Sequence, residues 1–197
     1  MRVWSTVLMS LAALATSWAS YQASLWSGTQ FQHGANAGAL RAKSTRAAGR
    51  AGELRMIDIG TFAHWMTARA GGDSVLADFI AARFRHEFKP AFDGWVASRP
   101  MHSRAAAPTP FVLPSYRLAD EAVADSLDRA AERESAASQR ANRISDTYVL
   151  DAVIMATVLF FAGTDAGALH RFRILNLLIA TGMLVTGIIR LLGAPRA

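Results

Sequence analysis

The strongly apolar residues of this chain are not spread evenly but gather in three segments, residues 3–19, 148–162 and 174–192. A transmembrane helix needs about 20 predominantly apolar residues to cross the hydrocarbon core of a bilayer. The first and third segments approach this length. The second is shorter and can cross only if flanking residues snorkel or the bilayer thins locally. We therefore predict an integral membrane protein with three transmembrane helices.

The first apolar segment supports two interpretations. The sequence Ala-Leu-Ala at residues 13–15 resembles a signal-peptidase site, which is typical of a cleaved signal peptide. Against cleavage, the apolar character continues beyond this site to Trp18. We favour an uncleaved signal anchor and expect the first transmembrane helix within residues 1–26.

A short link, GTDAGALHRFR, joins the second and third apolar segments. A link of this length is typical of two antiparallel helices, so we expect a transmembrane hairpin over residues 147–197. Asn176 lies in the first turn of its second helix. Arg190 lies near the end of that helix, where we expect its long side chain to snorkel to the lipid headgroups.

Asp151 lies about one helical turn inside the membrane interface of the predicted hairpin. A carboxylate that faces lipid near the bilayer centre costs on the order of 2 to 3 kcal/mol, so Asp151 should face protein or water. One interpretation is a proton or cation site. The other, which the absence of a second membrane acid favours, is an interfacial carboxylate hydrogen-bonded to a neighbouring helix, for instance near Tyr21 or Gln22.

Small residues recur at every fourth position along the first segment and beyond it, at Ala12, Thr16, Ser20, Ser24 and Gly28. On one helix they form a stripe, and such stripes let helix backbones approach closely in lipid. Residues 117–146 supply a matching amphipathic helix. We therefore expect the first two transmembrane helices to continue as a long antiparallel helical stalk. The alternative is that glycines break the first helix, since each costs about 1 kcal/mol relative to alanine.

We expect residues 27–146 to form a helical extramembrane domain on this stalk. No alternating strand pattern occurs in it. One apolar helix is predicted up to Gly71–Gly72, and a second, SVLADFIAARFRHEF, after Asp73, which can cap it. The aromatic ridge of these helices indicates a core rather than a cofactor site. The predicted fold class is therefore all-α.

Residues 98–115 hold four of the six prolines and cannot form a continuous helix. An extended segment of this kind suits laying across a helical surface or a partner. Its most apolar part is PTPFVLPSY, which makes Phe111, Val112 and Leu113 candidates for a partner-binding surface. The alternative is a strap packed on its own helical domain.

Composition narrows the classes of function. The 52% hydrophobic content exceeds that of ordinary soluble proteins, and the absence of cysteine excludes disulfides and thiolate metal sites. The formal net charge is +6, but the basic run at residues 41–55 lacks the interleaved aromatics of a nucleic-acid stacking platform. The five histidines show no i,i+4 pairing and no HExxH pattern. We therefore expect no nucleic-acid partner, no metal, no cofactor and no haem or pigment held within the bilayer.

The chain also lacks the sequence patterns of an enzyme. It contains no recognisable nucleophile and base, no phosphate loop and no metal-ligand spacing, so we predict a non-enzymatic protein. The charges that flank the apolar segments do not decide the orientation. Because the N-terminal segment resembles a signal anchor, which directs export of the chain after it, we expect the helical domain to lie outside the cytoplasm.

Five stretches carry a family resemblance: SYQASLWSGTQ, RAGELRMIDIGTFAHWM, FRHEFKPAFDGWVASRPMH, PTPFVLPSY and QRANRISDTYVL. In these stretches the chain resembles an uncharacterised family of small bacterial membrane proteins, and the similarity extends over nearly the whole chain. The resemblance implies three spans in a bacterial inner membrane. That family has no established activity, so the resemblance assigns no functional residues.

By elimination, the sequence favours a non-catalytic accessory or scaffold subunit of a larger bacterial membrane assembly, such as an energy-transducing one. Its expected partners are other membrane subunits and the lipid bilayer. The stripe of Ala12, Thr16, Ser20 and Ser24 supplies candidate contacts within the membrane. The alternative is a homo-oligomeric channel or transporter-like protein lined by Asp151 and Asn176.

Overall fold

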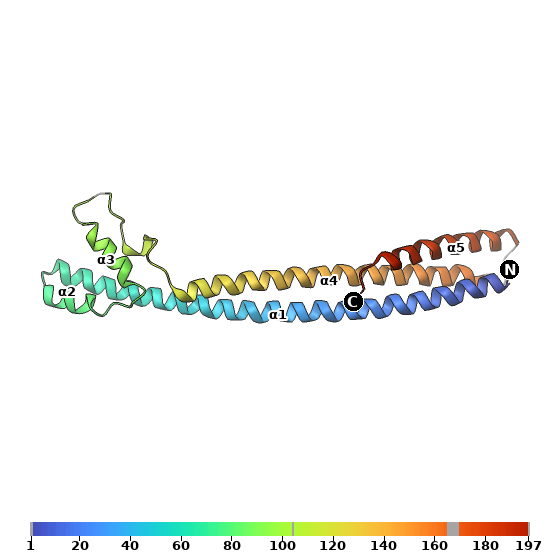
Figure 1. Ribbon diagram of the computed structural model, residues 1–197, viewed down its shortest axis with the longest axis horizontal. Coiled ribbons are helices and arrows are strands. Elements are labelled where there is room, and N and C mark those ends of the chain that lie inside the picture. The colour runs from blue at the N-terminus through green and yellow to red at the C-terminus, as the bar shows by residue number, and fades with distance from the viewer. Residues whose placement is uncertain (1, 104, 165–169, 197) are drawn as a thin grey trace. The chain divides into compact units, whose positions relative to one another are not determined.

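The computed structural model describes residues 2–103, 105–164 and 170–196 and shows an all-helical chain (Figure 1). Its elements are α1 (Arg2–Ala70), α2 (Ser74–Ala81), α3 (Lys89–Ala97), the short 3-10 helix η1 (Pro110–Val112), α4 (Ala119–Gly163) and α5 (His170–Gly193). These described residues include no strand, so the predicted all-α fold class is confirmed. The link residues 165–169, on which the expected hairpin turn falls, lie outside the described residues.

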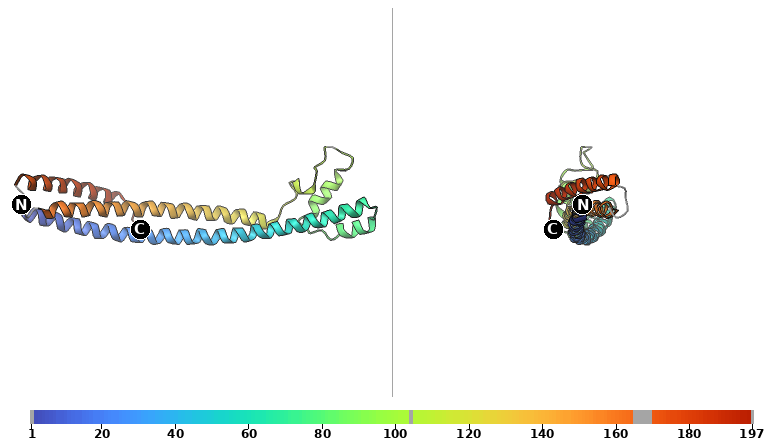
Figure 2. Two further views of the ribbon diagram at one scale, coloured as in Figure 1. Left: turned by 180° about the vertical axis from the view of Figure 1, so that it is seen from behind. Right: turned by 90° about the vertical axis from the view of Figure 1, so that its right-hand side faces the viewer.

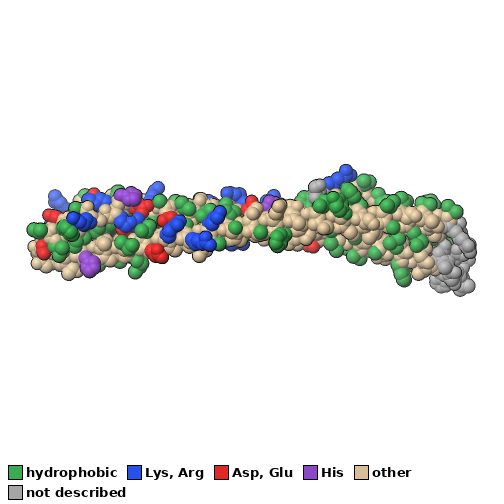
Figure 3. Space-filling model, turned by 90° about the horizontal axis from the view of Figure 1, so that it is seen from below, with side chains coloured by type: hydrophobic (Ala, Val, Ile, Leu, Met, Phe, Trp, Pro, Cys, Tyr) green, Lys and Arg blue, Asp and Glu red, His purple; other side chains and the backbone are tan. Residues whose placement is uncertain are grey.

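Three helices are long and apolar enough to cross a membrane: Val3–Ala70 within α1, Ala119–Gly163, which is α4, and Ile174–Gly193 within α5. This agrees with the three segments predicted from the sequence. In the right half of Figure 3, hydrophobic and uncharged side chains predominate on the face that is drawn. Most of the charged side chains visible on this face lie in the left half. The chain is therefore compatible with a multi-pass membrane protein.

The chain folds into two compact units, and both long helices contribute to each of them. Unit 1 comprises Met1–Ala37 and Glu132–Ala197, and unit 2 comprises Gly38–Ala131. Helix α1 passes through Gly34 and Gly49 without a break, so the alternative of a helix interrupted by its glycines is wrong. The membrane boundaries expected at residues 26 and 146 stay predictions, because the division into two compact units does not show where a bilayer begins or ends.

In unit 1, the first part of α1, the last part of α4 and α5 lie side by side (Figures 1 and 2). The Ser145 hydroxyl donates a hydrogen bond to the carbonyl of Ala23 at 3.0 Å, and the Ser138 hydroxyl donates one to the carbonyl of Gln30 at 2.9 Å. From the first of these contacts to the second, the residue number falls on α4 and rises on α1, as expected for antiparallel helices. The antiparallel helices expected from the sequence are thus present in unit 1.

The core of unit 1 combines alanines with larger apolar residues, and all three helices contribute to both kinds. Its buried members are Leu8, Ala12, Ala19 and Ala23 from α1, Tyr148, Met155, Val158 and Ala162 from α4, and Leu177, Ala180, Leu184 and Leu191 from α5. On α5, Gly187 leaves room for Met155, whose methyl group a Cβ at this position would overlap. Close packing in unit 1 therefore depends on small residues at particular positions.

The core of unit 2 is aromatic. The ring of Phe62 packs edge-on against the rings of Trp95 and Phe111, with centroids 5.2 and 5.6 Å apart. The same buried cluster includes Trp65, Phe84, Phe88 and Phe92. Offset and edge-to-face aromatic pairs at these separations stabilise a fold beyond the area that they bury. The predicted aromatic ridge is therefore confirmed as a core, except that Leu76 and Phe79, which were predicted to belong to it, are exposed.

Helix α2 begins as predicted but is shorter than expected. Asp73 caps it, because one carboxylate oxygen accepts a hydrogen bond from the backbone N–H of Leu76 at 2.9 Å. The helix ends at Ala81, whereas the sequence predicted one helix as far as Phe88. A turn follows, and α3 then begins with Pro90 in its first turn, where proline's missing N–H is not needed. This turn brings Arg85 to α1.

Candidate functional site

The strap residues Phe111, Val112 and Leu113, which the sequence offered as a partner-binding surface, point in different directions. The ring of Phe111 stacks on that of Phe88 with centroids 5.1 Å apart, and Leu113 packs on the same aromatic core. The indole nitrogen of Trp95 also donates a hydrogen bond to the carbonyl of Ala107 at 2.8 Å. The strap is therefore packed on its own domain, and only Val112 of the three is exposed.

The stripe of small residues predicted on α1 does not form one buried surface. Ala12 is fully buried, Thr16 is half-buried, and Ser20 and Ser24 are exposed on unit 1. A strict step of four residues turns about 40° around the helix each time, whereas the buried residues Ala12, Ala19 and Ala23 follow the mixed spacing of paired helices. The stripe is therefore not the seam that packs α1 within unit 1. Its contact with a partner stays a prediction.

Asp151 is fully buried and paired with a basic residue. One of its carboxylate oxygens accepts a hydrogen bond from Nε of Arg190 on α5 at 2.6 Å. The side chain of Arg190 is 41% exposed. The expectation of a carboxylate hydrogen-bonded to a neighbouring helix is confirmed, but the partner is Arg190 rather than a residue near Tyr21 or Gln22, and Arg190 does not serve only as a headgroup contact.

The structure does not bring Asp151 and Asn176 together. The side-chain amide of Asn176 donates a hydrogen bond to the hydroxyl of Thr164 at 3.1 Å, at the opposite end of α5 from Arg190. Positions 176 and 190 are separated by about 21 Å along the helix at 1.5 Å per residue. The two polar residues therefore belong to two separate contacts within the chain.

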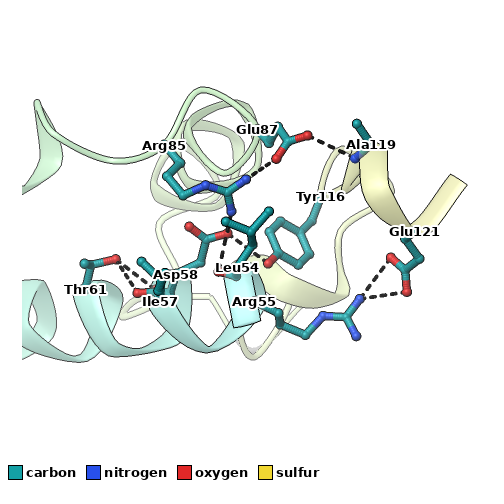
Figure 4. Close-up of polar contacts among 10 residues, drawn as sticks. All are labelled: Leu54, Arg55, Ile57, Asp58, Thr61, Arg85, Glu87, Tyr116, Ala119 and Glu121. Carbon is teal, nitrogen blue, oxygen red and sulfur yellow. Dashed lines mark hydrogen bonds and ion pairs between the residues drawn. The ribbon is translucent and has the colours of Figure 1, made fainter. Parts of the chain in front are cut away.

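A charged cluster in unit 2 surrounds Asp58 of α1 (Figure 4). The Asp58 side chain is 1% exposed, and its Oδ2 accepts hydrogen bonds from Arg85 Nη1 at 2.9 Å and from the Tyr116 hydroxyl at 3.0 Å. Its Oδ1 is buried and has no hydrogen-bond partner among the described residues. Arg85 comes from the turn before α3, and Tyr116 directly follows the strap, residues 98–115. The cluster therefore joins three segments that are distant in sequence.

The same cluster reaches the start of α4. Arg85 also forms an ion pair with Glu87, whose other carboxylate oxygen accepts a hydrogen bond from the backbone N–H of Ala119 at 3.0 Å. Ala119 is the first residue of α4, so Glu87 satisfies a free N–H group at this helix end. Nearby, Arg55 donates two hydrogen bonds of 3.0 Å to Glu121. These contacts fix the strap and the start of α4 on α1.

Burial governs the ionisation of this cluster. It raises the pKa of Asp58 above its ordinary value, although the hydrogen bond from Tyr116 and the charge of Arg85 act in the opposite direction. Burial, together with the hydrogen bond to Asp58, raises the pKa of Tyr116 to about 12. The ionised form of Tyr116 is therefore less stable in the folded chain than in the unfolded chain. The contribution of the neutral Tyr116 side chain to folding stability is fully present below pH 10, and it is lost as the pH rises towards about 12.

This pKa can be measured directly. The ultraviolet absorbance of tyrosinate, taken as the difference between the wild-type chain and Tyr116→Phe, should titrate with a midpoint at about pH 12. A difference signal with a midpoint near pH 10, the ordinary value for tyrosine, would show that Tyr116 is not enclosed by the cluster.

Helix α2 leaves much of its apolar surface uncovered in unit 2. The side chain of Val75 is 81% exposed and that of Phe79 is 53% exposed, and Leu76 beside them is also exposed. Only Ala77 of this helix is buried. The guanidinium of Arg83 lies 3.5 Å from the centroid of the Phe79 ring. We call Val75, Leu76 and Phe79 the α2 surface.

These features define an all-α protein with three helices able to span a membrane, an ion pair within unit 1 and an aromatic unit 2 that presents an apolar helix face. Comparison of the chain with protein-family models, with curated proteins and with solved structures gave no match. In the part of the chain that the structure describes, no three histidine, aspartate or glutamate side chains are grouped so that they could bind a metal ion.

Sequence reasoning missed both ion pairs and the α2 surface. Asp58 and Asp151 did carry a signal, because each is a single acid within an apolar stretch, in RMIDIG and YVLDAV. An acid in such a position requires a buried partner. The sequence does not reveal which of the many arginines that partner is, because Arg85 and Arg190 are adjacent to these acids only in the folded chain.

Proposed function

We propose that this protein is a non-catalytic scaffold or accessory subunit of a membrane assembly, anchored by its three apolar helices and bound to a partner protein through unit 2. The α2 surface carries this proposal. Val75 and Phe79 lie on a helix that packs on the aromatic core through Ala77, and both side chains are exposed to solvent. Contiguous apolar side chains on a domain surface typically mark a site of protein or membrane contact.

The charges around α2 favour a protein partner over a lipid surface. Helices that lie on membranes typically carry lysine and arginine on their polar face, because lipid headgroups are anionic. Helix α2 instead carries Asp78 and is capped by Asp73, and these two acids outnumber the one cation at the α2 surface, Arg83, which lies over the ring of Phe79. These two carboxylates oppose contact with anionic headgroups, whereas a protein partner can supply complementary basic groups.

The membrane part offers a second surface that suits a protein partner. A groove of about 370 Å³ lies between α1 and α4 in unit 1, lined by Ser20, Ala23, Val149, Ala152, Val153 and Ala156. Small residues at a helix surface allow close approach of another transmembrane helix. This groove contains Ser20 of the predicted small stripe. It supports association with other membrane subunits of the bacterial inner membrane.

A photo-crosslinking amino acid placed at Phe79 tests the proposal in intact cells of the native host. We expect an ultraviolet-dependent adduct between this chain and a different protein, because Phe79 would lie within the contact. Adding Val75→Glu to the same chain should abolish the adduct, since a buried carboxylate without a partner opposes association. Denaturing gels followed by mass spectrometry would measure the adduct.

Val123 provides the matched control, because it is also an exposed apolar residue of unit 2 but lies on α4. The crosslinker at this position should give little adduct. Absence of an adduct at Phe79, or equal adducts at both positions, would contradict docking through α2. An adduct between two copies of this chain would instead support the homo-oligomeric alternative.

The proposed orientation places unit 2 outside the cytoplasm. Because the chain contains no cysteine, single cysteines can report the side of the membrane. In intact cells, a membrane-impermeant thiol reagent should label Ser74→Cys in unit 2 and should not label Gly163→Cys at the end of α4. Labelling of only Gly163→Cys would reverse the orientation, and labelling of both would be inconsistent with three spans.

A further inference from the structure

Unit 2 contains a cavity of about 680 Å³ that is separate from the α2 surface and from the Asp58 cluster. Its apolar wall includes the rings of Trp65, Phe92 and Trp95. The indole N–H of Trp95 already donates a hydrogen bond to the carbonyl of Ala107 at 2.8 Å. Cavities of roughly 300 to 1,000 Å³ with aromatic walls are typical of sites for small organic ligands. The wall therefore suits a flat apolar group.

Charged residues line the same cavity, and cations outnumber acids among them. Arg69 and Arg99 lie there with a single acid, Asp78. Within residues 2–103, 105–164 and 170–196, neither of these arginines forms an ion pair, and both side chains are exposed, so their guanidinium groups are accessible to a ligand. Two unpaired guanidinium groups beside an apolar wall favour an anionic ligand, and a carboxylate matches their fork of N–H donors.

The backbone of Arg99 gives an independent indication. Arg99 follows the C-cap of α3 and has a positive φ of 50°, the only such non-glycine residue in the described chain. Helix α1 ends in the same left-handed way at Gly72, whose φ is 80°. Glycine is the usual residue at such a helix end because a Cβ is disfavoured there. An arginine held in this conformation at the edge of a cavity indicates that its side chain is needed.

From these three observations we infer that the cavity binds a small aromatic carboxylate. The flat apolar body packs against the cavity wall that Trp65, Phe92 and Trp95 form, and the carboxylate accepts hydrogen bonds from Arg69 and Arg99. This site goes beyond the proposed scaffold function and does not depend on it, because neither Val75 nor Phe79 lines the cavity.

Three probes with one ring system and different charges test this inference: 2-naphthoate, neutral 2-naphthamide and cationic 2-naphthylmethylammonium. Equilibrium dialysis against the full chain in lipid nanodiscs, with empty nanodiscs as the blank, would measure binding. We expect one saturable site for 2-naphthoate with a Kd on the order of 100 μM. The other two probes should bind at least about ten-fold more weakly, since they cannot accept charge-assisted hydrogen bonds from both arginines.

Variants separate the role of the side chains from their effect on folding. Arg99→Gly and Arg69→Gln should each weaken 2-naphthoate binding by about ten-fold, while Arg46→Gln, an exposed arginine of α1 outside the cavity, should leave it unchanged. Arg99→Gly should keep or raise the thermal midpoint of the chain, because glycine tolerates the positive φ.

Lack of saturable binding of 2-naphthoate would overturn the inference. So would equal binding of the three probes, or wild-type affinity in Arg99→Gly. Either of the last two results would mean that the arginines do not select the ligand.

Discussion

Replacing Arg190 with leucine should destabilise unit 1 by about 3 kcal/mol or more. The reason is that the variant leaves the Asp151 carboxylate, which is 0% exposed, without the N–H group that lies 2.6 Å from it. An unpaired buried carboxylate loses its hydration without compensation. Thermal unfolding of the full chain in mild detergent, followed by the circular dichroism of its helices, would measure the loss.

The reverse replacement should be much milder. In Asp151→Leu, the remaining Arg190 side chain is 41% exposed and can reach water or headgroups, so we expect a loss of about 1 kcal/mol or less. The double variant Asp151→Leu with Arg190→Leu should recover most of the stability lost in Arg190→Leu. Equal effects of the two single replacements would contradict this asymmetry, and would mean that Asp151 has access to water.

Replacing Asp58 with alanine should cost unit 2 about 3 to 5 kcal/mol. The variant removes the acceptor of two hydrogen bonds, those from Arg85 and from the Tyr116 hydroxyl. Arg85 keeps Glu87 as a partner, but the strap loses its attachment to α1. We therefore expect faster proteolysis within residues 98–118 together with a lower unfolding temperature, and limited proteolysis would measure the first effect.

The matched control for this replacement is Asp125→Ala, because Asp125 is an exposed acid of the same unit. This variant should change the unfolding temperature little. Combining Asp58→Leu with Arg85→Met and Tyr116→Phe should recover much of the loss, since apolar groups of similar volume can replace a buried polar cluster. Normal stability of Asp58→Ala would show that the cluster does not hold the strap.

These two ion pairs have a common consequence for the proposed scaffold. Arg190 ties the end of α5 to α4 in unit 1, where the carbonyl of Pro195 also accepts hydrogen bonds from Trp26 and Tyr148. In unit 2, the Asp58 cluster fixes the strap and the turn after α2. A docking subunit needs surfaces held in a fixed geometry, because ordering them on binding reduces affinity.

The sequence by itself determined the helices and their ability to cross a membrane. The apolar segments and the lack of strand alternation are local properties, so they correctly predicted an all-α chain with three helices long and apolar enough to span a membrane. The N-cap at Asp73 and the helix end near Gly72 were also predicted, since each depends on residues only a few positions apart. The end of α2 at Ala81 was not predicted, because the turn after it is stabilised by contacts of Arg85 and Phe88 with distant residues.

Only the tertiary structure decided which side chains act together. The sequence placed Thr16, Ser20 and Ser24 on one stripe, but the helix packs through a different set because its 3.6-residue period carries a four-residue repeat away from the seam. The sequence singled out Asp151 but did not identify its partner, because Arg190 becomes adjacent to Asp151 only when α5 packs on α4. Exposure of the α2 surface and pairing of Asp58 likewise depend on the fold of unit 2. Such contacts join residues far apart in the chain, and no local pattern encodes them.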